Sequence, residues 1–274
     1  MGEAKRKRQT HVEIIAREPR CIYCPNPVES IEHMPPIGMF RGRQRPGAME
    51  FGTCKACNSG TRGSDAVAAV MARMHPDHAE GSWQTEEIRS LISAMDAHAP
   101  GVREEMSLPG KSNYEWARRP GSGLVQRVVR VHADGPRVNA HLSVFGAKLA
   151  MALYREHVGV ALPLDGAVWC QFALNGGTTQ ENLDARVKIL PLQETLRQGL
   201  KSVGDQFAYR YNCDERTVIA AVVQFHRSLW FTIFASSDHK IIELFKKPEF
   251  LQLPASVMVG PGNLLSLLSA PAQG

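Results

Sequence analysis

The sequence predicts an α+β fold in which helices and an antiparallel sheet occupy different parts of the chain. Apolar residues recur with helical spacing in three segments, and short runs rich in β-branched and aromatic residues dominate the second half. The last runs are separated by only a few polar residues, which is typical of strands joined by tight turns. The helical segments are 67–74, 88–95 and 142–153, and the strand-like runs are 124–131, 167–174, 206–212, 217–225 and 229–235.

The helical segments are predicted to supply core faces rather than binding surfaces. In the segment 67–74 apolar residues recur at spacings of three and four, and Asp65 just before it is expected to cap the helix. Gly159 is placed to end the helix that contains 142–153. In the run 229–235 alternate residues are expected to point to opposite faces of the sheet.

The charge distribution and the hydropathy of the chain indicate which classes of binding partner to expect. The net charge is +5, and residues 1–65 contain eleven Lys and Arg against seven Asp and Glu, so +4 of that charge lies in the first quarter. Basic charge concentrated there is expected if this region meets phosphate. No apolar run approaches the length of a membrane span, and no apolar region of a secretory signal follows the basic run 5–8. We therefore expect no membrane partner and a cytoplasmic location, where thiols stay reduced.

Two cysteine pairs carry the strongest chemical signal in the chain. Cys21 and Cys24 form one CxxC pair, Cys54 and Cys57 form a second, and 29 residues separate the pairs. Two such pairs in a reducing compartment are typical of a tetrahedral Zn²⁺ site with four thiolate ligands, which stabilises a fold without performing chemistry. Unrelated redox dithiols are a weaker interpretation, because no thioredoxin-like βαβ pattern surrounds either pair.

The residues around these pairs resemble the HNH endonuclease family of ββα-metal nucleases, in its zinc-stapled branch. An acid–histidine pair, Glu32 and His33, follows the first CxxC and precedes two prolines, and Asn58 follows the second CxxC directly. The resemblance covers about residues 20–75. It implies that His33 is the general base, and that Glu32 and Asn58 hold a catalytic Mg²⁺ or Mn²⁺. It further implies that the substrate is DNA, with RNA as an alternative.

The residue types suit this chemistry independently of the family. Phosphodiester hydrolysis needs an activated water and a cation against the developing charge, and a histidine titrates in the useful pH range. Glu32 and His33 are adjacent, so in a regular strand they would point to opposite faces, and a shared site requires the chain to bend. The middle Asn typical of the family is replaced by Met49 and Glu50. Whether Glu50 or Asp65 joins the metal site stays open.

Basic residues near this motif are candidate phosphate contacts. Arg41, Arg43 and Arg45 occupy every second position, so in an extended loop all three would point the same way. Lys55 and Arg62 flank the second cysteine pair. The alternative is that all five are ordinary solvated side chains.

We therefore expect a basic N-terminal arm or helix (1–19), a zinc-stapled HNH module (20–80) and a larger α+β domain (81–274). The α+β domain would serve recognition or regulation, and its tail, 254–274, is expected to be poorly ordered. A homodimer would be compatible with cutting both strands. Two alternatives remain: a non-catalytic, zinc-stabilised nucleic-acid-binding module, and a zinc-stabilised protein-interaction domain.

Overall fold

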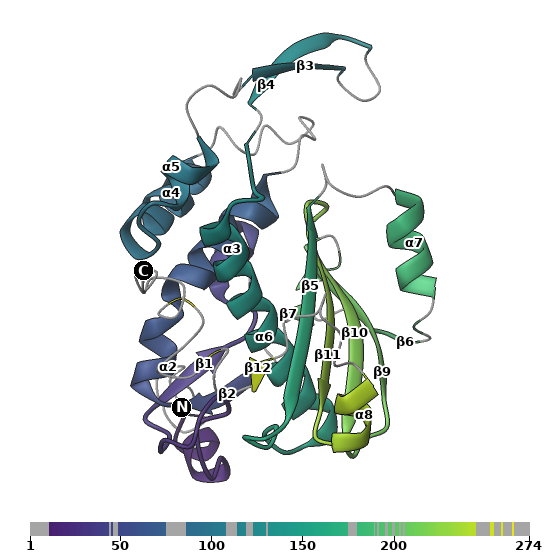
Figure 1. The fold of residues 1–274 in the computed structure, drawn as a ribbon. Coiled ribbons are helices and arrows are strands. Elements are labelled where there is room, and N and C mark those ends of the chain that lie inside the picture. The colour runs from purple at the N-terminus through teal and green to yellow at the C-terminus, as the bar shows by residue number, and fades with distance from the viewer. Residues whose placement is uncertain are drawn as a thin grey trace, which may run out of the picture.

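The computed structural model has mixed helices and antiparallel sheets, which confirms the α+β class (Figure 1). It describes residues 11–43, 45, 49–74, 86–107, 114–118, 123–129, 131–174, 180–188, 190, 192–194, 197–198, 201–202, 204, 206–244, 253–254, 259 and 265. Within them, no helix is both long and apolar enough to cross a membrane.

The N-terminal part is a two-stranded hairpin followed by two consecutive helices. Residues 11–17 are helical, and the strands β1 and β2 then pair antiparallel. Two short 3-10 turns lie between the strands, and helix α2 begins immediately after β2. The bounds are β1 Ser30–His33, η1 Ile37–Met39, η2 Arg41–Arg43, β2 Glu50–Thr53, α2 Lys55–Gly60 and α3 Arg62–Arg73.

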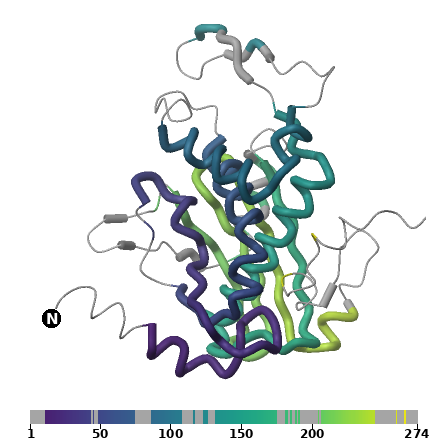
Figure 2. Tube along the Cα trace, turned by 90° about the vertical axis from the view of Figure 1, so that its left-hand side faces the viewer, coloured from purple at the N-terminus to yellow at the C-terminus, as the bar shows by residue number. Residues whose placement is uncertain are grey.

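Two further helices and a second hairpin follow. Helix α4 packs on α3, and the hairpin of β3 and β4 stands away from the rest of the chain in both views (Figures 1 and 2). The bounds are α4 Glu86–His98, α5 Val102–Met106, β3 Tyr114–Arg118 and β4 Val125–Val129.

The long helix α6, Pro136–Val158, packs on a sheet whose described strands run in the order β12-β5-β11-β10-β9-β6. Gly146 permits this close approach, because a Cβ there would lie 2.9 Å from the Cys170 sulfur on β5. The remaining bounds are β5 Ala167–Leu174, α7 Gln180–Lys188, β6 Leu192–Glu194, β7 Arg197–Gln198, β8 Lys201–Ser202, β9 Phe207–Cys213, β10 Val218–Phe225, β11 Leu229–Ser236, α8 His239–Leu244 and β12 Leu253–Pro254.

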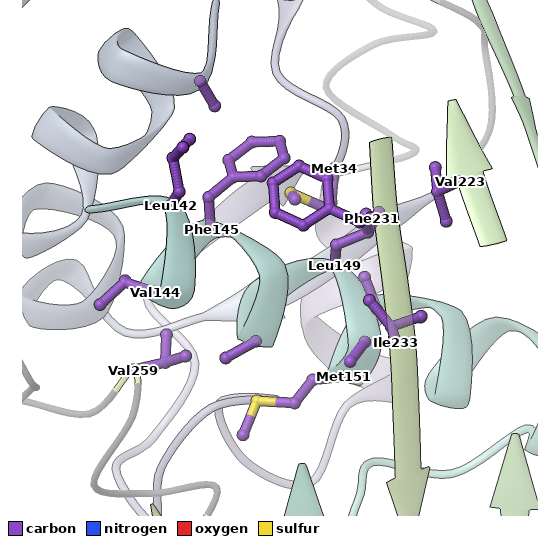
Figure 3. Close-up of a cluster of buried hydrophobic side chains, with 14 of the residues drawn as sticks. Met34, Leu142, Val144, Phe145, Leu149, Met151, Val223, Phe231, Ile233 and Val259 are labelled. Atoms are coloured by element: carbon purple, nitrogen blue, oxygen red, sulfur yellow. The ribbon is translucent and has the colours of Figure 1, made fainter. Parts of the chain in front are cut away.

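One hydrophobic cluster joins the two ends of the chain. Met34, which follows β1, is buried together with Phe145 and Leu149 of α6 and Phe231 of β11 (Figure 3). Helix α6 also contacts α3, so it lies between the N-terminal helices and the sheet. The N-terminal part and the sheet thus contribute to one continuous core. The boundary predicted between residues 80 and 81 falls outside the described residues.

The predicted helices and most of the predicted strands are confirmed. The segments 67–74, 88–95 and 142–153 lie almost wholly within α3, α4 and α6, and Gly159 ends α6 with a left-handed φ of 87°. Alternate residues of β11 are buried, as expected for a strand with one face on the core. Residues 1–10 of the predicted arm or helix (1–19) and most of the tail at 254–274 lie outside the described residues.

The predicted helix cap at Asp65 is wrong. Helix α3 begins three residues earlier, at Arg62, with Thr61 in the capping position. Asp65 therefore lies within the first helical turn, and its carboxylate accepts hydrogen bonds from Lys148 of α6 instead of from the backbone of its own helix.

Candidate functional site

The four cysteines predicted to bind zinc come together in one buried group. Their sulfur atoms all lie within 4.8 Å of one another, with Cys24 Sγ 3.6 Å from Cys54 Sγ and 3.5 Å from Cys57 Sγ. A tetrahedral ion with bonds of about 2.3 Å would separate its sulfur ligands by about 3.8 Å. This group of four cysteines, Cys21, Cys24, Cys54 and Cys57, can thus hold a metal ion such as zinc.

Backbone donors orient these sulfur atoms. Tyr23 N donates to Cys21 Sγ and Cys57 N donates to Cys54 Sγ, each over 3.4 Å. Cys54 is also the N-cap of α2, so the positive end of that short helix faces its sulfur. The hydrogen bond from Tyr23 favours the thiolate form of Cys21, and thiolate is the form that binds metal.

The pKa values of three of these four cysteines are shifted, in different directions. A hydrogen bond from the Cys57 thiol lowers the pKa of Cys21 to about 5. Burial raises the pKa of Cys24 to about 11, and the pKa of Cys57 is raised by its hydrogen bond to Cys21 and by burial. Neighbouring thiolates repel in a buried site, so a bound cation is what would permit all four to ionise.

The hairpin separates the two residues of the predicted acid–histidine pair. In the β1–β2 register Glu32 lies opposite Phe51 and His33 opposite Glu50, so the pairing stays regular and the expected bend does not occur. Side chains of adjacent strand residues point to opposite faces. Glu32 is accordingly buried, whereas 45% of the His33 side chain is exposed.

Glu32 belongs to a buried ionic cluster. Its Oε2 lies 3.5 Å from Lys148 Nζ, and that ammonium is 2.7 and 2.9 Å from the two carboxylate oxygens of Asp65. Lys148 is fully buried. Burial raises the pKa of Glu32 to about 7, although the nearby ammonium of Lys148 opposes the shift. Lys148 thus lies between the two carboxylates in the position that a cation would take, and the role of Glu32 as a ligand of a catalytic ion stays a prediction.

Asn58 connects α2 to the β1–β2 hairpin through two hydrogen bonds. Its Nδ2 donates to Ser30 Oγ and to the Ile31 carbonyl oxygen, each over 3.2 Å. The amide nitrogen of Asn58 is thus engaged within the protein, and its role as a ligand through the amide oxygen stays a prediction. Among the described residues, the four-cysteine group is the only cluster of three or more His, Cys, Asp or Glu side chains that could hold an ion.

His33 has an acidic partner on the neighbouring strand. Its Nδ1 lies 3.3 Å from Oε1 of Glu50. A carboxylate accepts hydrogen bonds, so Nδ1 is assigned the proton and Nε2 is left as an acceptor. Burial and the charge of Arg45 lower the pKa of His33, although Glu50 acts in the opposite direction. The lowered pKa favours the neutral imidazole, which is the form that a proton acceptor needs.

The arginine loop differs from its prediction. Residues 41–43 form a 3-10 turn instead of an extended segment, so Arg41, Arg43 and Arg45 do not point the same way. Arg43 is exposed, Arg41 is partly buried, and Arg45 is buried with only 7% exposed. The guanidinium of Arg45 is held inside the protein, which does not favour the phosphate contact predicted for it.

The other basic candidates are available to solvent. Lys55 is 76% exposed and lies 3.9 Å from Glu29, and Arg62 is exposed at the start of α3. With Arg43 they leave basic charge on the N-terminal part of the chain. Whether they contact a nucleic acid stays a prediction.

Sequence reasoning missed two residues that define this region. Lys148 lies three residues after Phe145 and one before Leu149, inside the apolar stripe of α6. A charged residue on such a stripe is a sign of a buried ion pair. Glu50 is the observed partner of His33, a role that the sequence leaves open. Only the strand register could reveal that pairing, because 16 residues separate the two in sequence.

Comparisons of the chain with protein-family models, with curated proteins and with solved structures return no match. The chemistry of the site itself is therefore the basis for a functional proposal.

Proposed function

We propose that this protein is a metal-dependent endonuclease that hydrolyses DNA phosphodiester bonds, with His33 as the general base. One observation carries the proposal. A half-exposed histidine at the end of β1 has its Nδ1 3.3 Å from a carboxylate oxygen, and its lowered pKa favours an unprotonated second nitrogen.

The reaction would use the two nitrogens of His33 differently. Nε2 accepts a proton from a water molecule as the water oxygen attacks phosphorus, and Nδ1 keeps its proton through the contact with Glu50. The imidazolium formed in this step is stabilised by the same carboxylate. The bond from phosphorus to the leaving sugar oxygen breaks, and that oxygen takes a proton from a solvent water molecule.

The divalent ion is expected from the chemistry and not from an assembled ligand set. Mg²⁺ or Mn²⁺ would neutralise charge on the phosphate in such a reaction. Glu32 does not fit as its ligand, because its carboxylate is buried beside Lys148, and Asn58 directs its amide nitrogen to β1. The proposed steps therefore use only side chains of the protein itself.

The remaining features support a nucleic-acid substrate. The four-cysteine group would hold a structural Zn²⁺ that stabilises the hairpin and α2, and exposed Arg43, Lys55 and Arg62 would meet the phosphate backbone. DNA is the proposed substrate, and RNA is the alternative that a direct comparison of the two would distinguish.

Nicking of supercoiled plasmid tests this proposal, with Mg²⁺ or Mn²⁺ supplied and an RNA of similar length as a second substrate. We expect the wild type to nick and His33→Ala to lose activity by about 100-fold or more, the usual contribution of a general base. His239→Ala is the matched control, because His239 is also exposed beside a carboxylate, 3.2 Å from Asp165. If His33→Ala cleaves as fast as the wild type, or if the purified wild type cleaves neither substrate with either ion, the proposal is wrong.

The second candidate function is a zinc-stabilised nucleic-acid-binding module without catalysis. The buried ionic cluster favours it, because Glu32 there stabilises the fold and supplies no ligand. This alternative predicts salt-dependent DNA binding that is equal in the wild type and in His33→Ala, with no cleavage by either protein.

A further inference from the structure

Arg45 braces the loop between the two strands that carry His33 and Glu50. Its Nε donates to the Pro35 carbonyl oxygen over 2.8 Å, and its Nη2 donates to the Met49 carbonyl oxygen over 3.0 Å. Pro35 lies two residues after His33, and Met49 immediately precedes Glu50. One planar guanidinium thus joins the end of β1 to the start of β2.

The same guanidinium also reaches the carboxylate beside the histidine. Arg45 Nη1 lies 3.3 Å from Glu50 Oε1, the oxygen that is also 3.3 Å from His33 Nδ1. Glu50 therefore lies between a buried cation on one side and the imidazole on the other. Its side chain is 26% exposed, so this contact restricts a group that would otherwise move in solvent.

We propose that Arg45 is a positioning residue for His33, an inference that rests on the proposed nuclease function. It holds Glu50 so that one carboxylate oxygen accepts from Nδ1, which keeps the proton on that nitrogen and leaves Nε2 unprotonated toward the substrate. It touches neither substrate nor water in the reaction, and it acts through Glu50 and through the two carbonyl groups.

The burial of Arg45 separates this role from a phosphate contact. All three guanidinium nitrogens make contacts within the protein, and the residue is only 7% exposed. Arg43, two residues earlier, is exposed and has no such brace among the described contacts. We therefore expect that substitution of Arg43 changes DNA binding and that substitution of Arg45 does not.

Arg45→Gln and Arg43→Gln form a matched pair for kinetic and binding measurements. We expect Arg45→Gln to lower kcat by about 100-fold, the scale of a misplaced catalytic group. Its DNA affinity and its salt dependence of binding should match the wild type. Arg43→Gln should instead weaken DNA binding and reduce the slope of log K against log salt by about 0.9, as expected for one lost phosphate contact. If Arg45→Gln loses salt slope as Arg43→Gln does, or keeps the wild-type kcat, the inference is overturned.

A measurement without substrate separates this inference from the proposed function. The ¹⁵N chemical shifts of the His33 ring, recorded at one pH where it is neutral, report which nitrogen carries the proton. We expect a single Nδ1-protonated form in the wild type and a mixture of tautomers in Arg45→Gln and Glu50→Gln. An unchanged tautomer in Arg45→Gln would overturn the positioning role even if the enzyme is active. Absence of cleavage by the wild type would instead overturn the function, and the ring shifts would still decide the role of Arg45.

Folding of the variants is checked by zinc content and thermal unfolding. If Arg45→Gln does not retain zinc, Arg45→Lys replaces it in these measurements. Lysine keeps the buried positive charge but lacks the planar guanidinium group. We expect Arg45→Lys to show the same tautomer mixture and a smaller fall in kcat. A wild-type tautomer and kcat in Arg45→Lys would overturn the inference, because a point charge alone would then suffice.

Discussion

The buried ion cluster should make Lys148 one of the most important residues for stability. Lys148→Met keeps most of the side-chain volume and removes the ammonium between Glu32 and Asp65. Breaking a buried ion pair by removing one partner costs about 3–5 kcal/mol. The Asp65 side chain retains 19% exposure, which lets water relieve part of the repulsion, so we expect the lower half of that range, about 3–4 kcal/mol.

Thermal unfolding followed by circular dichroism, in zinc-saturated buffer at pH 7.5, measures this loss. At about 2–4 °C per kcal/mol for a chain of this size, Tm should fall by about 6–16 °C. Lys240→Met is the control, because Lys240 is exposed and should change stability by no more than about 0.5 kcal/mol.

A rescue variant tests the reasoning behind this number. Adding Glu32→Gln and Asp65→Asn to Lys148→Met removes the two uncompensated charges, and neutral replacements of a whole buried ionic group are often tolerated. We expect the triple variant to recover at least half of the lost stability. If Lys148→Met costs less than about 1 kcal/mol, or if the triple variant is no more stable than Lys148→Met, the cluster does not act as described.

Three further predictions concern the fold. Cys57→Ser should lose zinc in an elemental assay and unfold the N-terminal part, whereas Cys213→Ser should keep both zinc and fold. The pKa of Glu32 is raised to about 7, so the stability it contributes is fully present below its ordinary value of 4.5 and is lost as pH rises through 7. The wild type should therefore lose free energy of unfolding between pH 5 and pH 8, whereas Glu32→Gln should not. Urea unfolding measures both proteins, and a difference that stays constant over this range would contradict the pKa shift. Gly146→Ala should cost about 1–3 kcal/mol, because its Cβ would press on β5 and β11, whereas Gly60→Ala, with nothing within 4 Å, should not.

The position of Glu32 changes the interpretation of the nuclease-like motif. An acid next to a histidine looks like a catalytic pair in a linear sequence, and the resemblance assigned it that role. In the hairpin the two side chains occupy opposite faces, and the acid beside His33 comes from β2. The His33 function and the Glu32 function are therefore separable by mutation, with cleavage lost in one variant and pH-dependent stability altered in the other.

Local patterns in the sequence determined the secondary structure and the cysteine site. The apolar spacing at 67–74 and 142–153 is a property of the helix period, and paired CxxC motifs constrain their own sulfur atoms over short loops. These signals need no long-range information. The α+β class and the four-cysteine cluster are therefore predictable from the sequence by itself.

Tertiary structure alone decided which charged groups meet. Lys148 reaches Asp65 across 83 positions of sequence, and Glu50 reaches His33 only through the strand register. A one-residue shift of that register would move every side chain of β2 to the other face, so sequence spacing cannot predict such a contact. Arg45 differs from Arg43 for a related reason: a turn at residues 41–43 replaces the expected extended loop, and the burial that follows converts a predicted phosphate contact into an internal brace.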